Sequence, residues 1–196
     1  MKTERISINN RELGMTVALS MTEKLGAEQG LERKQILHLR LLAEELFSML
    51  RSLTGEVDAE YWLEYEGKRF DIHMKSDVVL TDELRQQFLS ASTSGENAAA
   101  KGVMGKLRVM IAEALVTRPS VPAFSLGLVS AASPTAQVAG ANAYQWSMEK
   151  YKAEVKKQED AESWDELEKS IVANIADEVS VRIIGANVEI IVTKAF

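Results

Sequence analysis

The chain contains no cysteine in its 196 residues. This absence excludes disulfide bridges, thiolate nucleophiles and thiolate metal sites, and it fits a reducing compartment. Histidine is nearly as scarce, because the sequence has two, His38 and His73, and they are far apart. We therefore predict no metal site.

Long apolar runs are also missing. No segment approaches the roughly 20 apolar residues of a membrane-spanning helix, and the first residues, MKTERISINN, lack the apolar core of a signal peptide. We expect a cytoplasmic protein that does not enter a membrane. The net charge of −6 makes the chain a poor general binder of nucleic acid, because nucleic acid is itself a polyanion.

Two common catalytic signatures are absent as well. There is no nucleophile elbow, and neither histidine has a neighbouring Ser–Asp pattern. No Walker loop of the form GxxxxGKS or GxxxxGKT occurs. What remains is an ordinary globular composition, with 46% hydrophobic and 27% charged residues. The length suits one domain with a substantial core, or one domain with an insertion.

One stretch, residues 36–53, has the strongest helical pattern of the chain. Its apolar residues recur at spacings of three and four and form one broad face, which predicts an amphipathic helix on a core. The apolar face consists of Ile36, Leu39, Leu42, Ala43, Leu46, Phe47, Met49, Leu50 and Leu53. At its edge lie His38 and Glu45, and a carboxylate at that position either points into a cleft or is solvated.

Further helices are predicted on both sides of this stretch. In residues 13–27 the apolar residues recur every four, and Gly26 and Gly30 bracket the end, where left-handed backbone is needed. Helices are also expected at 80–89, at 102–115 and from Ser163, where Ser-Trp-Asp-Glu has capping-box spacing. The predicted inward residues are Leu13, Val17, Met21 and Leu25 in the first helix and Leu167, Ile171 and Ile175 in the last. Residues 91–101 are predicted to form a loop.

Alternating apolar residues predict strands. A short strand is expected at 4–8, one hairpin at 59–65 and 69–75, and a second hairpin at 178–184 and 188–193. Helices and antiparallel hairpins that follow one another in blocks favour an α+β protein. We predict a two-layer α/β sandwich, with a mixed, mostly antiparallel sheet and the helices on one face.

The segment 117–160 is predicted to be an insertion. It begins with the three prolines of the chain, and small residues dominate up to Ala143. Aromatic and methionine residues then mark one side of a charged helix, at Tyr144, Met148, Tyr151 and Val155. Such residues are common at interfaces. Either this segment packs over the side of the domain or between protomers of a homo-oligomer, or its side chains cover their own core.

The stretch RELGMTVALSMTEKLGAEQGLERKQILHLRLLAEELFSML, residues 11–50, resembles the N-terminal part of anti-sigma-factor serine kinases. These belong to the GHKL, or Bergerat-fold, histidine-kinase-like ATPase superfamily. The resemblance implies a single domain of that type over residues 1–196. It places Glu45 at the family's general-base position and makes Asp77, or Ser76, the nearest candidate for the adenine carboxylate. Gly102 and Gly105 match the later glycine box, where a helix start attracts phosphate.

Two departures bear on activity. Met49 stands where the family has the asparagine that holds magnesium, and residues 75–79 lack the glycines of the family's DxGxG loop. We therefore expect weak or absent binding of ATP. The predicted function is that of an anti-sigma-type regulatory protein that binds a protein partner, such as a sigma factor or an anti-sigma antagonist. The alternatives are an active ATP-dependent protein serine kinase of the same family and a structural or oligomeric module.

Overall fold

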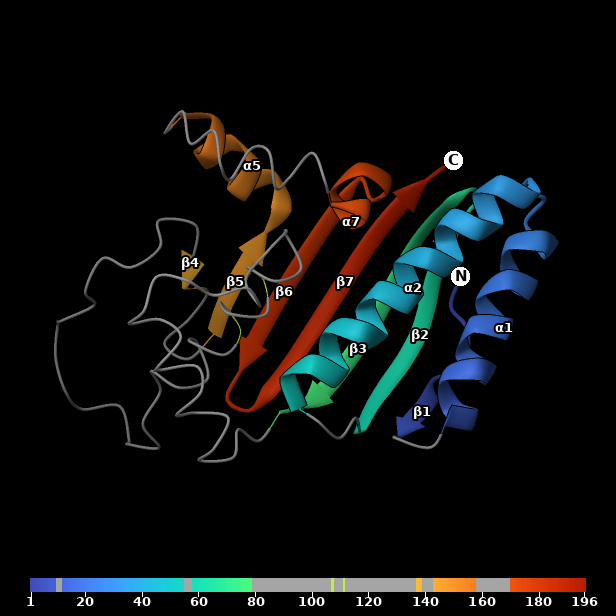
Figure 1. The fold of residues 1–196 in the computed structure, drawn as a ribbon, viewed down its shortest axis with the longest axis horizontal. Helices are drawn as coiled ribbons and strands as arrows, with labels where there is room; N and C mark the ends of the chain where they lie inside the picture. Colours follow the sequence, from blue (N-terminus) through green and yellow to red (C-terminus); the bar gives the residue numbers. More distant parts are fainter. Residues whose placement is uncertain are drawn as a thin grey trace, which may run out of the picture.

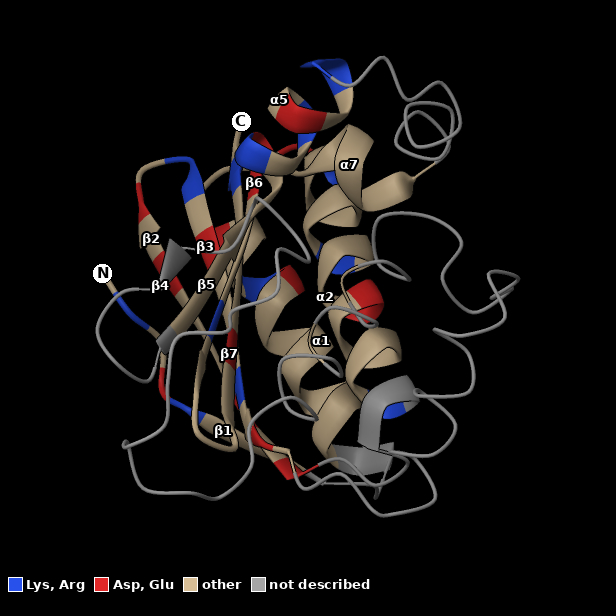
Figure 2. Ribbon diagram, turned by 90° about the vertical axis from the view of Figure 1, so that its left-hand side faces the viewer, with Lys and Arg blue, Asp and Glu red and all other residues tan. Residues whose placement is uncertain are grey.

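The computed structural model describes residues 1–9, 12–54, 58–78, 107, 111, 137–138, 143–157 and 170–196. These residues form two layers, a sheet and a set of helices packed against one of its faces (Figures 1 and 2). In chain order the elements are β1 (Ile6–Asn9), α1 (Glu12–Glu28), α2 (Arg33–Thr54), β2 (Asp58–Glu66), β3 (Arg69–Asp77), β4 (Gln137–Val138), β5 (Ala143–Ser147), α5 (Met148–Lys157), α7 (Ile171–Ile175), β6 (Glu178–Ile184) and β7 (Asn187–Ala195).

The sheet has the strand order β1-β2-β3-β7-β6-β5-β4. Both predicted hairpins are confirmed, and they meet at the centre, where β3 pairs with β7 from Arg69↔Ala195 to Asp77↔Asn187. Every pairing between described strands is antiparallel. The predicted α+β class is therefore confirmed, but the parallel component expected for a mixed sheet is not present among these strands.

The core lies between α2 and the sheet. Every predicted inward position from Leu39 to Leu50 is buried, which confirms the apolar face. The ring of Phe47 on α2 meets that of Tyr61 on β2, with centroids 5.2 Å apart. The alternating apolar residues of β3 (Phe70, Ile72 and Met74) face inward and are buried. Strand alternation thus gives the sheet one apolar face, and the apolar side chains along one side of α2 cover this face.

Three glycines have the left-handed backbone that favours this residue. Gly67 and Gly185 form the tight turns of the two hairpins, with φ of 56° and 63°, and Gly30 follows α1 with φ of 71°. Gly26 was also expected at the end of α1, but it lies inside the helix. A Cβ atom there would come within 3.2 Å of Cγ1 of Ile36. Gly26 therefore allows α1 to approach α2 closely.

The prediction of a helix that includes Tyr144 is wrong. Residues Ala143–Ser147 form the strand β5, which pairs with β6, and the helix α5 begins only at Met148. Pairing with β6 turns Trp146 to the inner face of the sheet, where it is 4% exposed. Residues 143–157 of the predicted insertion are thus part of the sheet and of its helical layer.

Two inward positions are also corrected. Val17 on α1 is 48% exposed, and the neighbouring Ala18 and Thr22 are buried in its place. Ile171 is 49% exposed, while Val172 is buried. In both helices the buried side chain is the one directly after the predicted residue.

The last predicted helix does not run without interruption from residue 163 to Ile175. Ser170 has an extended backbone and caps α7, since its side chain accepts a hydrogen bond from the backbone N–H of Ala173.

The predicted helix at 80–89 and the loop at 91–101 lie outside the described residues, as does most of 102–115. From the last segment Leu107 and Ile111 are described, and both are helical and buried. Within the described part of the chain, no helix is long and apolar enough to cross a bilayer.

Candidate functional site

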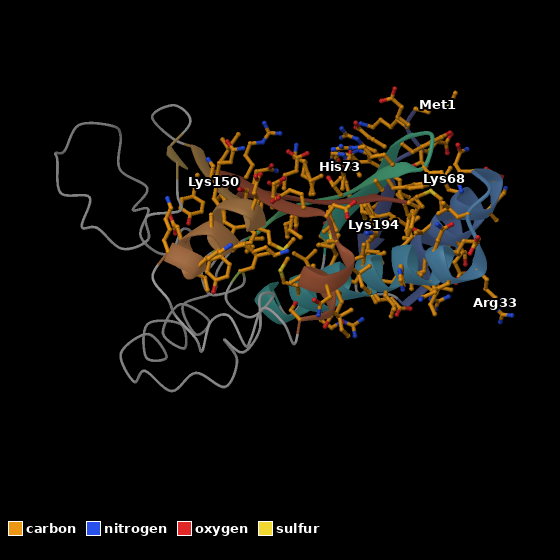
Figure 3. All side chains as sticks on the ribbon, turned by 90° about the horizontal axis from the view of Figure 1, so that it is seen from above. Met1, Arg33, Lys68, His73, Lys150 and Lys194 are labelled. Atoms are coloured by element: carbon orange, nitrogen blue, oxygen red, sulfur yellow. The ribbon has the colours of Figure 1, made fainter. Side chains whose placement is uncertain are left out.

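The face of the sheet turned away from α1 and α2 is called the outer face here. In Figure 3, Met1 and His73 lie on this side, and Arg33, at the start of α2, lies on the other. Strand alternation and register assign polar residues to most outward positions. They include Ser7, Glu60, Glu64, Asp71, Lys75, Asp77, Ser180, Arg182, Glu189 and Thr193.

Two aromatic rings form the centre of the outer face. Trp62 on β2 stacks on His73 on β3, with centroids 4.8 Å apart and an angle of 11° between the planes. Lys2 Nζ and Arg5 Cζ lie 4.8 Å and 4.4 Å from the Trp62 ring. Because β2 lies between β1 and β3, the indole is held between cations from the N-terminal segment and the imidazole. Trp62 is 2% exposed and thus buried by its polar neighbours.

Two carboxylates flank this stack. Glu64 accepts hydrogen bonds from Lys2 Nζ at 2.9 Å and Trp62 Nε1 at 3.1 Å. The bond from Lys2 is the main cause of the lowered pKa of Glu64. Glu189 on β7 accepts a hydrogen bond from Arg182 at 2.6 Å. Burial raises the pKa of Glu189, but Arg182 outweighs burial and the pKa is lowered.

His73 lies between these carboxylates. Its Nδ1 is 3.6 Å from Glu189 Oε1, and its Nε2 is 3.9 Å from Glu64 Oε1. Both distances are longer than a hydrogen bond, and buried Nδ1 has no hydrogen-bond partner among the described residues. Burial lowers the pKa of His73 below 6.5, although the nearby carboxylates oppose this effect. The imidazole is therefore neutral at pH 7.

A hollow of about 480 Å³ lies at the end of the outer face where β2 begins and β3 ends. It is lined by Arg5, Ser7, Asp58, Ala59, Glu60, Lys75, Ser76, Asp77 and Asn187. Arg5 forms a 2.8 Å ion pair with Glu60, and Asn187 donates a 2.8 Å hydrogen bond to Asp77. We refer to this hollow as the polar groove.

The predicted nucleotide-site residues are not brought together by the described part of the structure. Glu45 is half-buried on α2, and Met49 is 4% exposed within the core. Asp77 is exposed on the outer face, so α2 and Asp77 lie on opposite sides of the sheet. Ser76, the other adenine candidate, faces inward and donates a hydrogen bond to the backbone carbonyl of Asp58 at 2.7 Å. Gly102 and Gly105 lie outside the described residues.

Sequence reasoning missed the stack and its carboxylates. The alternation of β2 and β3 puts Trp62 and His73 on the outward phase, and the tight turn between these strands could have paired them. No local signal could have indicated Glu189, because it reaches His73 through pairing of strands that are distant in sequence. Across the described ranges, no group of three His, Cys, Asp or Glu side chains is arranged to hold a metal ion.

Comparison with protein-family models, with curated proteins and with solved structures found no match to this chain.

Proposed function

We propose that this chain is a regulatory protein of anti-sigma type, with a degenerate histidine-kinase-like ATPase fold, that acts by binding a protein partner. The order of the elements supports the fold. A strand, two helices and a hairpin come first, and a closing hairpin completes the sheet. The closing strand β7 lies beside β3, so the two hairpins form one continuous surface.

The observation that carries partner binding is the outer face, which no described element covers (Figure 3). The charged residues of its polar groove are two bases, Arg5 and Lys75, and three acids, Asp58, Glu60 and Asp77. Since Arg5 is already paired with Glu60, the remaining charge of the groove is negative. Opposite charge steers association and fixes orientation. We therefore propose a partner that presents lysine or arginine side chains.

The surroundings of Met49 support a binding function over phosphoryl transfer. Magnesium prefers hard oxygen ligands, and a buried thioether is soft and neutral. Without the ion, the charge that develops on the phosphates lacks its main stabiliser. Glu45, one turn earlier on α2, cannot replace this contribution.

Partner binding is tested by affinity purification from the native host, followed by calorimetry with the purified partner. The test variant is the double charge reversal Asp58→Lys with Asp77→Lys. The matched control is Glu28→Lys, which reverses an exposed charge on α1, in the helical layer. We expect one protein to be recovered with wild type and control, lost with the double variant and bound less tightly at high salt. Equal recovery by all three chains would refute the outer face as the binding surface.

Nucleotide chemistry is tested separately. Titration calorimetry with ATP, with and without magnesium, should show weak or no binding and no turnover. Tight magnesium-dependent binding, with turnover abolished by Glu45→Ala, would establish the kinase alternative instead.

A further inference from the structure

His73 is a buried titratable side chain on the central strand pair of the sheet, and neither its stacking nor its burial is explained by partner binding. The side chain is held between β2 and β7, and the residue is 8% exposed. A buried polar nitrogen without a hydrogen bond is costly and uncommon in folded proteins. Nδ1 of His73 is such a nitrogen among the described residues.

The surroundings of His73 offer a carboxylate to each ring nitrogen, which is the arrangement that a protonated ring could use. A neutral ring carries one N–H group, and the protonated ring carries two. One carboxylate faces each nitrogen, since Glu189 lies 3.6 Å from Nδ1 and Glu64 lies 3.9 Å from Nε2. Shortening these contacts by about 0.7 Å at Nδ1 and about 1.0 Å at Nε2 would turn both into charge-assisted hydrogen bonds.

Both carboxylates are already engaged by cations. Glu64 binds Lys2 at 2.9 Å, and Glu189 binds Arg182 at 2.6 Å. A protonated His73 therefore competes with Lys2 and with Arg182. It also places a positive charge against the indole of Trp62, whose ring already has Lys2 and Arg5 over it.

We propose that His73 is a proton-operated switch. When His73 gains a proton, it forms ion pairs with Glu64 and Glu189, and this weakens the contact between β2 and the N-terminal segment that precedes β1. In the neutral state Glu64 holds Lys2, and the segment stays on the sheet. In the protonated state the segment loses this ion pair and is repelled by a new charge beneath Trp62.

The N-terminal segment is the part of the chain that Lys2 ties to Glu64, and Figure 3 shows Met1 on the same side of the sheet as His73. Before β1 begins, hydrogen bonds of Met1 and Thr3 also hold it to β2, including one from the N-terminal ammonium to the carbonyl of Tyr65 at 2.5 Å. The N–H of Tyr65 donates to the carbonyl of Met1 at 2.8 Å, and the N–H of Thr3 donates to the carbonyl of Leu63 at 2.9 Å. Thr3 Oγ1 also accepts a hydrogen bond from the N–H of Leu63 at 2.9 Å.

Charges of both signs surround His73 on the outer face. The acids that face it or flank it on the outer face are Glu60 and Glu64 from β2, Asp71 from β3 and Glu189 from β7. The bases are Lys2 and Arg5 from the N-terminal segment, Arg69 and Lys75 from β3 and Arg182 from β6. Burial outweighs the attraction of the carboxylates and lowers the pKa of His73, so the ring gains a proton only when the solution becomes acidic.

The switch is tested by NMR on the isolated chain, from about pH 8 down to about pH 4.5, a range set by the ordinary pKa of histidine. The probes are the His73 ring, the indole N–H of Trp62, and the amides of Leu63 and Tyr65. The test variant is His73→Gln, and the other histidine, on α2, supplies the matched control His38→Gln. We expect Trp62 and Tyr65 to shift with the same midpoint as the His73 ring, below pH 6.5. Exchange of the Tyr65 amide, corrected for intrinsic pH dependence, should accelerate through the same midpoint.

In His73→Gln these coupled changes should vanish, and in His38→Gln they should persist. A second variant, Glu189→Gln, removes one attraction for the proton and should move the His73 midpoint to lower pH. Trp62 and Tyr65 signals that do not follow the His73 titration, or an unchanged midpoint in Glu189→Gln, would overturn the proposal. No partner is present in this experiment, so its failure leaves the proposed binding function untouched. An effect of pH on partner binding, by contrast, rests on that function.

Discussion

Apart from the edge strand β4, the sheet is built from two blocks with the same order of described elements. The first block consists of β1, α1, α2, β2 and β3, and the second of β5, α5, α7, β6 and β7. Each block starts with a strand, continues with two described helices and ends with a hairpin. Across the sheet, the strands of the first block follow chain order, as β1-β2-β3, and those of the second block follow in reverse chain order, as β7-β6-β5. The two blocks join where β3 pairs with β7 (Figure 1).

The two blocks differ in how their helices are held. In the first, α1 and α2 have 17 and 22 residues, and α2 buries an apolar stripe on the sheet. In the second, α5 and α7 have 10 and 5 residues, and polar contacts fix their ends. Glu178 on β6 accepts hydrogen bonds from the first N–H groups of α5. The same arrangement of strands is therefore stabilised by apolar burial in one block and more by helix capping in the other.

The largest expected effect is a loss of packing in the first block. Leu46→Ala on α2 removes a side chain with 0% exposure and should lower the free energy of unfolding by about 2–5 kcal/mol. Val172→Ala on α7 removes less buried surface and should cost about 1.5 kcal/mol, at roughly 0.8 kcal/mol per methylene-sized group. Urea denaturation measures both losses, provided that the slope of the unfolding free energy against urea concentration is the same in wild type and variants. An equal or greater loss for Val172→Ala would contradict the proposed difference between the blocks.

A smaller effect is expected from the buried polar pair of the first block. Thr22 Oγ1 lies 2.6 Å from the hydroxyl of Tyr61 and donates to the carbonyl of Ala18 at 2.8 Å. Thr22→Val leaves the Tyr61 hydroxyl buried without this partner and should cost about 1–3 kcal/mol. Tyr61→Phe leaves Thr22 bonded to Ala18 and should cost only about 0.5–1.5 kcal/mol. The same denaturation assay tests the order, and a larger loss for Tyr61→Phe would show that the pair is not held as described.

The second block should respond locally to the loss of a cap. Glu178→Ala removes the acceptor for the N–H groups of Met148, at 2.8 Å, and Glu149, at 3.2 Å. Caps of this kind contribute about 0.5–2 kcal/mol. Hydrogen exchange should accelerate in α5 while the amides of α2 keep their protection, because short helices can open without global unfolding. Uniform acceleration in both helices would indicate that the blocks unfold as one unit.

The sequence allowed most of the first block to be predicted because each of its elements has a clear local period. The strand period of Phe70, Ile72 and Met74 and the helical period of α2 require no knowledge of neighbours. The second block was less predictable. Tyr144, Met148, Tyr151 and Val155 fit one helical face, yet the first of these lies on β5. Pairing with β6, which follows much later in the chain, decides between strand and helix there.

The candidate site was the least predictable part for the same reason. The resemblance directed attention to Glu45 and Asp77, which the register places on opposite sides of the sheet. The buried centre of the outer face brings together Trp62 and His73 of the first block with Glu189 of the second. Its burial depends on the register across three strands. Alternation predicts only that each of these side chains points outward.

The smallest expected effect on stability comes from the cluster of Trp62, His73 and Glu189, which is the junction between the two blocks. The pKa of His73 in the folded chain lies below its ordinary value of 6.5, so the unfolded chain takes up a proton first as the pH falls. The contribution of neutral His73 to stability is therefore complete above about pH 6.5 and is lost as the pH falls through the folded pKa. Glu64 and Glu189 also have lowered pKa values, and their contributions are lost only below the ordinary glutamate value of 4.5.

Among the described groups with a lowered pKa, His73 is the one whose ordinary value lies at the upper end of the pH range from 6.5 to 4.5, so a loss of stability between the two values reports on His73. Urea midpoints should fall between pH 6.5 and 4.5 for wild type and for His38→Gln, and they should stay nearly level for His73→Gln. If the junction also couples the blocks, the amides of β3 and of β7 should lose protection together across this range. A fall of equal size in His73→Gln would assign the pH dependence to other groups and would show that His73 takes no part in coupling the two blocks.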